Sequence, residues 1–365
     1  MMVVSKQHQI FFDFLRFCIG SESEIPSSLK EADWKELYRI AQKQCLVGIL
    51  FDGIQKLPPA EVGISKDLLL QWMMQCQMLE KANVRLNDAA IQVSEWFRKK
   101  GFRTCVLKGQ GNALLYPNGL HRTPGDIDIW VEGGDKRVIS FVRSISPHEK
   151  ACYHHIEFPS YKGMEVEVHY RPSFLLCFWH NRKLQKYYER VKEEQFSHRV
   201  MLGEQGEIAI PKVEFNLIFQ LTHIFAHLMN EGIGLRQLLD YYYVLISDDL
   251  LLIRDRVQKE LKELGVWKFA GAIMYIMQEV FGMPASRLIV PPNEKYGKFV
   301  LNEVLEAGNF GKHDERNRFG RSKLGHNLQR VYRDMRLVRY FPIEALNEPL
   351  FRIWHFFWRK YHLFY

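Results

Sequence analysis

The sequence predicts an α+β protein, in which a small mixed β-sheet with helices packed on it is flanked by N- and C-terminal helical regions. Apolar residues recur at three- and four-residue spacing through residues 1–100 and again after residue 213. Between these regions, short alternating segments interleave with helical ones. We therefore expect an N-terminal helical region at 1–100, a mixed core at 101–212 and a C-terminal helical domain at 213–365.

The composition is that of an ordinary globular protein with a sizeable core. The 365 residues are 47% hydrophobic and 25% charged, which excludes a disordered or fibrous chain. The 50 Lys and Arg residues exceed the 42 Asp and Glu residues, so the formal net charge is +8. This modest excess is compatible with a phosphate-bearing substrate. It also permits nucleic acid as a partner, without favouring it.

Cysteine usage and hydropathy predict a cytoplasmic protein without a transmembrane segment. The six cysteines are scattered and contain no CxxC pair, which favours reduced thiols over a disulfide framework. Charged residues interrupt the N-terminal apolar runs, so the start does not resemble a secretory signal. The most apolar window, "FNLIFQLTHIFAHLM", is broken by polar residues and is too short to span a bilayer.

The individual elements follow from periodicity and from glycine and proline positions. Segment 67–100 has a helical pattern that Gly101 ends. In the core, "FRTCVLK" and "DIDIWVE" have strand patterns, with a short helix at "GQGNALLYP" between them. "GDKRVISFVRSIS" predicts a helix that stops before Pro147, and "CYHHIEF" and "MEVEVHY" predict strands joined by a turn at "PSYKG". Further helices are expected at 213–230, 234–247, 249–264 and 267–282.

Two aspartates, Asp126 and Asp128, lie in a segment that otherwise reads as a buried strand. Side chains alternate along a strand, so both aspartates share one face with Trp130 while the isoleucines share the other. The isoleucine face suits a core, and the aspartate face must point outward or into a cleft. Two carboxylates about 7 Å apart along a strand repel each other, and a divalent cation between them removes that cost. Oxygen ligands of this kind suit Mg²⁺.

A second acidic strand repeats this pattern. Glu165, Glu167 and His169 share one face of "MEVEVHY". If this strand pairs beside the first, a third carboxylate joins the two aspartates, and three carboxylates are what two-metal phosphoryl-transfer chemistry needs. The alternative is an ordinary half-exposed strand with an acidic face. The lysine–glycine turn upstream and the second acidic strand together favour the metal site.

The stretch "VLKGQGNALLYP" ends a strand and opens a helix with Lys108, Gly109 and Gly111. Glycines let the backbone approach a ligand closely, and free amides at a helix start attract phosphate. Lys108 adds a positive charge suited to a triphosphate. The pattern matches neither of the common glycine-rich nucleotide motifs, so the alternative is a strand–turn–helix corner with an exposed lysine.

The pattern "LKG…LYP…R…GDIDIWV…EVEVH" resembles the DNA-polymerase-beta-like nucleotidyltransferase superfamily. More narrowly, the chain is similar to a bacterial family of largely uncharacterised nucleotidyltransferases. This similarity includes "DWKELYRIAQKQCLVGIL" and "GIGLRQLLDYYYVL", so it covers most of the chain. Lys108-Gly109 stands where the wider superfamily has a Gly-Ser pair, and the spacing to Asp126 is longer than usual there.

The resemblance implies a nucleotidyltransferase core and an enzyme that moves a nucleoside monophosphate from an NTP, with ATP expected, to an acceptor hydroxyl and releases pyrophosphate. It implies that Asp126 and Asp128 bind Mg²⁺ or Mn²⁺. It implies that Glu167 is the third carboxylate, which assists the metal or acts as base, with Glu165 as the competing choice. The acceptor stays unidentified. The alternative function is a catalytically inactive nucleotide- or partner-binding protein on the same fold.

The resemblance also implies a phosphate-binding set. Lys108 and Gly109 would face the triphosphate of the NTP. Arg122, four residues before Asp126, would reach phosphate as well, and the alternative is a surface arginine beside a turn.

Two pairs at i, i+4 spacing share helix faces in the C-terminal domain. His223 and His227 have the spacing of zinc ligands, but the glutamate of the HExxH signature is missing. Histidines that face the cleft or pack in the core are therefore favoured. Arg236 and Asp240 are expected either to pair with each other or to line the cleft.

The end of the chain is basic and then aromatic. Arginines recur every three residues within the basic stretch 312–340, which suits either a solvated helix face or a surface for anionic partners. The tail "FRIWHFFWRKYHLFY" suits either a membrane surface or packing against the helical domain.

Overall fold

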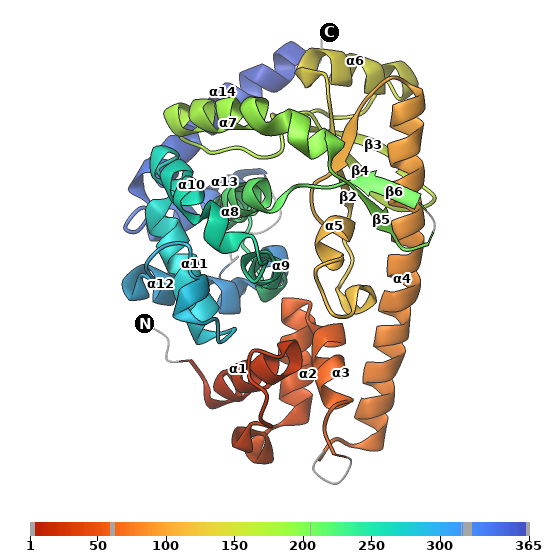
Figure 1. Ribbon diagram of the computed structural model, residues 1–365. Helices are drawn as coiled ribbons and strands as arrows, with labels where there is room; N and C mark the ends of the chain where they lie inside the picture. Colours follow the sequence, from red (N-terminus) through yellow and green to blue (C-terminus); the bar gives the residue numbers. More distant parts are fainter. Residues whose placement is uncertain (1–3, 59–62, 205, 315, 317–322, 363–365) are drawn as a thin grey trace.

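The computed structural model describes residues 4–58, 63–204, 206–314, 316 and 323–362. It confirms the predicted α+β class, because a small mixed sheet lies among helices that precede and follow it in the chain (Figure 1).

Within the described residues, four strands form the central sheet in the order β1-β2-β4-β3. The strands are β1 (Thr104–Val106), β2 (Ile127–Val131), β3 (His155–Tyr161) and β4 (Met164–His169). β2 pairs with β4 in parallel, while β1 and β3 run antiparallel to their neighbours. In the parallel ladder Asp128 lies opposite Glu167. The second acidic strand therefore pairs beside the first, as the sequence predicted.

The hairpin between β3 and β4 is tighter than predicted. Its turn consists of Lys162 and Gly163, both with positive φ (52° and 80°), which suits a two-residue turn between antiparallel strands. β3 runs on to Tyr161 through a break in register after Phe158. It begins at His155 rather than at Cys152, so the predicted strand 152–158 was placed too early.

The isoleucine face of β2 is buried, as predicted. Ile127, Ile129 and Val131 join a hydrophobic cluster with the long helix α4 (Lys66–Lys99) and with α6 (Gly134–Ile145). Figure 1 shows α4 running from the N-terminal helices along the sheet. The C-terminal half of α4 thus covers one face of the sheet.

The aspartate face of β2 is covered by helices as well. Trp130 packs on Phe196 of α7 (Phe178–Ser197), with ring centroids 4.6 Å apart, and stacks on Phe215 of α8 (Val213–Asn230). Burial of both faces of β2 leaves the acidic side chains at the end of the strand, where the helices leave a cavity.

The first helices of the N-terminal region form the lower part of Figure 1, and α4 extends from them up one side of the molecule. The region comprises α1 (Lys6–Ile19), the 3₁₀-helix η1 (Ser27–Glu31), α2 (Trp34–Gln44), α3 (Val47–Ile54) and α4. Between β1 and β2 lie the short helices α5 (Gln110–Ala113) and η2 (Gly119–His121). Asn83 of α4 donates hydrogen bonds to the carbonyls of Leu120 and Arg122, and these bonds tie the loop before β2 to α4.

The C-terminal helices follow the predicted order. α8, α9 (Leu235–Leu245), α10 (Leu250–Glu263) and α11 (Trp267–Glu279) agree closely with the four predicted segments. Two elements were not predicted: α7 and a hairpin formed by β5 (Arg199–Leu202) and β6 (Gly206–Ala209). The remaining elements are η3 (Ala285–Arg287), α12 (Glu294–Ala307), η4 (Asn309–Gly311), α13 (Lys323–Leu337) and α14 (Pro342–His362).

Candidate active site

Three carboxylates from neighbouring strands converge at the end of the sheet. Asp126 directly precedes β2, Asp128 is the second residue of β2, and Glu167 lies opposite Asp128 on β4. Each offers an oxygen, and these oxygens all lie within 4.8 Å of one another. The parallel register creates this cluster, because it sets the two strands side by side in the same direction.

Asp128 is the most enclosed of the three, with a side chain that is 1% exposed. Its Oδ1 atom lies 3.1 Å from Lys108 Nζ and 3.0 Å from His169 Nε2. Burial acts to raise the pKa of Asp128, but the charges of Lys108 and His169 outweigh it and hold the pKa below its ordinary value. Its Oδ2 atom is buried and has no hydrogen-bond partner among the described residues. A buried carboxylate oxygen without a partner is costly, and a bound cation would satisfy it.

Glu167 contacts two imidazoles on the same side of the sheet. Its Oε2 atom lies 3.3 Å from His169 Nε2 and 3.3 Å from His155 Nδ1. Burial acts to raise the pKa of Glu167, yet the hydrogen bond from His169 and the proximity of His155 lower it to about 2. Glu165 is exposed and lies nearer the hairpin turn, and it does not contribute to the carboxylate cluster. Of the two glutamates that the sequence left open, Glu167 is the one near the aspartates.

The lysine–glycine turn lies against the carboxylates. Gly109 has a φ of +63°, a left-handed conformation that favours glycine, and a Cβ there would lie 3.6 Å from the carbonyl oxygen of Asp126. Lys108 is largely buried rather than exposed, and its Nζ atom contacts both Asp128 and His223 Nε2, the latter at 3.1 Å. Burial acts to lower the pKa of Lys108, but the three carboxylates raise it, so the ammonium stays charged.

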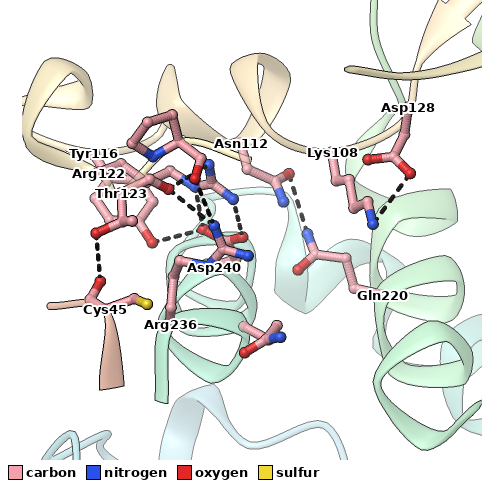
Figure 2. A network of polar contacts seen from close by, with 12 residues as sticks. Cys45, Lys108, Asn112, Tyr116, Arg122, Thr123, Asp128, Gln220, Arg236 and Asp240 are labelled. Atoms are coloured by element: carbon pink, nitrogen blue, oxygen red, sulfur yellow. Dashed lines mark hydrogen bonds and ion pairs between the residues drawn. The ribbon is translucent and has the colours of Figure 1, made fainter. Parts of the chain in front are cut away.

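Arg122 points into a buried ion pair. Its Nε and Nη2 atoms each donate to Asp240 at 2.7 Å, and Tyr116 donates its hydroxyl to the same carboxylate at 2.6 Å (Figure 2). Arg236 donates to the carbonyls of Thr123 and Pro124 rather than to Asp240. Of the two alternatives for this i, i+4 pair, mutual pairing is therefore wrong, whereas both residues line a small hollow beside Lys108 and Asp126. α9 instead fixes the loop that leads to Asp126.

A cavity of about 550 Å³ opens beside the carboxylates. Lys108, Asp126 and Glu167 form its floor, and His223 and His227 of α8 form part of its wall. A much smaller hollow, of about 30 Å³, also borders Lys108 and Asp126, and further polar residues line it. This lining includes Gly109, Arg122, Arg236 and Asp240.

His223 and His227 face the larger cavity of about 550 Å³, as the sequence favoured. Their Nε2 atoms are 2.9 Å apart. Burial, together with the nearby Lys108 ammonium, lowers both pKa values, that of His227 to about 3, so both rings are neutral. Neither belongs to a group of three or more ligand atoms within 4.8 Å among the described residues.

The basic stretch 312–340 contributes to the same cavity, although residues 315 and 317–322 lie outside the described residues. Lys312 and Arg330 line the cavity, whereas Arg336 pairs with Glu303 at 3.2 Å. The aromatic tail packs beside the same cavity. Rings of α14 surround Tyr153 just before β3, and Phe351 and His355 line the cavity; the rings that contact Tyr153 are Phe351, Trp354 and Trp358. The tail thus packs beside the start of β3 and contributes to the cavity lining. Residues 363–365 lie outside the described chain.

A family model described as an uncharacterised nucleotidyltransferase matches residues 30–282. The chain belongs to this family. No curated protein and no solved structure matches it. The match includes the sheet, the carboxylates and α8 to α11, and it ends before α12. Membership in the nucleotidyltransferase family classifies the chain as a transferase.

Two further properties concern the cysteines and the helices. All six cysteines are free in the structure. Among the described helices, none combines the length and the apolar character needed to cross a membrane.

Sequence reasoning missed two groups near the carboxylates. His155 reaches Glu167 only because the register of β3 sets it opposite His169, and the alternation of "CYHHIEF" does not fix that register. Lys312, directly after η4, and Arg330 of α13 line the cavity; the sequence marked the basic stretch 312–340 as a surface for anionic partners but did not place these two side chains beside the carboxylates.

Proposed function

We propose that the chain is a metal-dependent nucleotidyltransferase that transfers a nucleoside monophosphate from an NTP, with ATP expected, to an acceptor hydroxyl and releases pyrophosphate. The convergence of Asp126, Asp128 and Glu167 carries this proposal, together with family membership. The order β1-β2-β4-β3, with acids on the two parallel strands, supports placement among the DNA-polymerase-beta-like nucleotidyltransferases.

The donor set fits a hard divalent cation. Three carboxylate oxygens lie within 4.8 Å of one another. The buried Oδ2 atom of Asp128 has no hydrogen-bond partner among the described residues, and a cation would satisfy it. Mg²⁺, or Mn²⁺ in its place, takes carboxylate oxygens and fills its remaining positions with water and substrate phosphates. Asp126, Asp128 and Glu167 would hold it. When bound, such an ion supplies charge neutralisation for the phosphates and lowers the pKa of the attacking hydroxyl.

The chain's own groups have distinct parts in this reaction. Lys108, held between Asp128 and His223, brings a positive charge to the cavity floor where the polyphosphate would lie. Glu167 is better suited as a ligand than as a base, because its pKa of about 2 makes it a weak proton acceptor. Lys312 and Arg330 add positive charge to the cavity wall. Catalysis would rest on positioning and charge stabilisation.

Arg122 takes a different part from the one the resemblance implied. Both of its pairing nitrogens are engaged by Asp240, so we infer that it supports the loop before Asp126 rather than gripping phosphate. Gly109 allows the backbone to pass close to Asp126, and we propose that it lets the triphosphate approach.

Calorimetry tests this proposal, with Mg²⁺ and a non-hydrolysable ATP analogue titrated into the wild-type protein and into two variants. Asp126→Asn should abolish Mg²⁺-dependent nucleotide binding, because it removes a metal ligand. Glu165→Gln is the matched control on β4, since Glu165 is exposed and outside the cluster. It should bind as the wild type does. Equal binding by all three proteins would refute the assignment of the metal site.

Pyrophosphate release then separates the enzyme from the alternative function. Release from ATP in the presence of an acceptor extract, lost in Asp126→Asn, would support the transferase. Mg²⁺-dependent binding without any release would favour an inactive nucleotide-binding protein on the same fold.

A further inference from the structure

We propose that His155, Glu167 and His169 form a second metal site, selective for a transition-metal ion of the zinc class. Each of these residues offers one ligand atom, and the three atoms lie within 4.8 Å of one another. The site adjoins the proposed Mg²⁺ site and shares Glu167 with it. It differs by having imidazole nitrogens, which the family resemblance does not assign to any metal.

Two of the three separations between the ligand atoms match those around one ion, and the third is at most 4.8 Å. His155 Nδ1 and His169 Nε2 each lie 3.3 Å from Glu167 Oε2. Two ligands at about 2.1 Å from a metal, with an angle between 90° and the tetrahedral value, are about 3.0–3.4 Å apart. The observed contacts fall within that range. An ion bound to Glu167 Oε2 would therefore lie at bonding distance from each imidazole nitrogen, judged one pair at a time.

His169 is held as metal-ligating histidines usually are. Its Nδ1 atom lies 3.3 Å from the carbonyl oxygen of Arg171, to which it can donate its proton. That hydrogen bond leaves Nε2 facing Glu167 and Asp128, 3.3 Å and 3.0 Å away. A ligating histidine typically donates its second nitrogen to a backbone carbonyl or carboxylate, which fixes the ring for the metal.

His155 lies at the border of the cavity, and a bound ion would replace the contact that its Nδ1 atom makes with His154. Its Nδ1 atom is 3.1 Å from His154 Nε2 as well as 3.3 Å from Glu167. His155 and Glu167 both line the cavity, so an ion can reach them from the space beside the sheet. A cation here would bind His155, Glu167 and His169 together, and it would take the place of the proton that His169 Nε2 directs toward Asp128 and Glu167.

The ligand set decides which ion binds. Imidazole nitrogen suits zinc and related transition metals, whereas Mg²⁺ prefers an all-oxygen set. The three carboxylates of the proposed active site suit Mg²⁺, and the two-histidine set beside them does not. Metal binding at His155 and His169 does not depend on the proposed transferase function, since it requires no nucleotide.

Cobalt titration of the nucleotide-free protein tests the proposal, because Co²⁺ replaces Zn²⁺ and absorbs visible light when bound by nitrogen ligands in a low-coordinate site. We expect one equivalent of Co²⁺ to produce visible ligand-field bands. A large excess of Mg²⁺ should leave these bands in place, and one equivalent of Zn²⁺ should remove them. This wild-type comparison needs no variant. Absence of the bands, or their removal by Mg²⁺, would overturn the proposal.

Variants locate the site. His155→Ala should lose the Co²⁺ bands, and His148→Ala is the matched control because His148 is exposed and outside the cavity. Asp126→Asn should keep the bands while losing Mg²⁺-dependent nucleotide binding, so failure of the second site and failure of the proposed function give different results. Retention of unchanged bands in His155→Ala would contradict the assignment.

Discussion

The buried pair between Arg122 and Asp240 offers the sharpest test of how the site is held. Asp240→Asn preserves the shape of the side chain but removes the negative charge that faces the guanidinium of Arg122. Both side chains are at most 7% exposed, so water does not compensate the loss. Arg122 then keeps its positive charge in a buried position without a counter-charge.

The structure sets the expected magnitude. Removing one partner of a buried, hydrogen-bonded ion pair typically costs about 3–5 kcal/mol, because the other charge stays buried and uncompensated. With an unfolding entropy near ~2.1 cal/mol/K per residue, this loss lowers the melting temperature of a chain of this length by about 4–7 °C. Nucleotide binding should weaken as well, since Arg122 and Arg236 both fix the loop that ends at Asp126.

Thermal unfolding by circular dichroism measures the effect, and urea unfolding gives the free energy. The double variant Arg122→Met/Asp240→Leu serves as the control, because it removes both charges and leaves neither unpaired. It should lose less stability than Asp240→Asn. A melting temperature for Asp240→Asn within about 1 °C of the wild type, or a larger loss in the double variant, would refute the reasoning.

Two further predictions concern charge in the cavity. In the metal-free protein, the free energy of unfolding should fall as the pH rises from 6.5 through about 9. The reason is that hydrogen bonds to Asp128 and Glu167 raise the pKa of His169 to about 9, although burial acts to lower it. The stabilisation from protonated His169 is complete below pH 6.5 and amounts to at most about 3 kcal/mol. Urea unfolding across this pH range measures it, and a free energy of unfolding that does not change with pH would contradict it. Replacing both Lys312 and Arg330 by alanine should weaken binding of the Mg²⁺–ATP analogue by about one to two orders of magnitude, with unfolding unchanged. Calorimetry measures this, and an affinity equal to that of the wild type would exclude the phosphate contact.

Local periodicity was enough to predict the acidic strands, because strand alternation depends only on neighbouring residues. It placed Asp126 and Asp128 at one end of β2 and buried the isoleucines on the other face, as the structure has them. It could not choose between Glu165 and Glu167. That choice depends on the register of β2 against β4, and the register is fixed by the packing of both strands in the sheet.

Long-range pairs were beyond sequence reasoning. Arg122 and Asp240 are 118 residues apart, and nothing in either segment indicates the other. The pairing of Arg236 with Asp240 seemed natural because i, i+4 residues are neighbours on a helix. In the structure both side chains bind the loop before β2 instead: Arg236 donates to carbonyls of this loop, and Asp240 accepts from Arg122.

Some missed elements did carry a local signal. In α7 the buried residues Leu184, Tyr187 and Tyr188 recur at three- and four-residue spacing, as a helix packed on one face requires. The β5–β6 hairpin is harder to predict, because its strands have four residues each and only Leu202, Ile208 and Ala209 are buried. Short, half-exposed strands leave too few alternations to detect.

The charge balance at the carboxylates explains how three acids, one of them buried, can lie together before any ion binds. Lys108 and His169 contact Asp128, and His169 also contacts Glu167, so two cations face the three carboxylates of Asp126, Asp128 and Glu167. One net negative charge remains, and a divalent ion would reverse it to one net positive charge. Such a site would attract a polyphosphate only after the ion is bound. On the proposed function, we therefore infer that Lys108 and His169 keep the acids assembled and that the metal and the nucleotide bind as a unit.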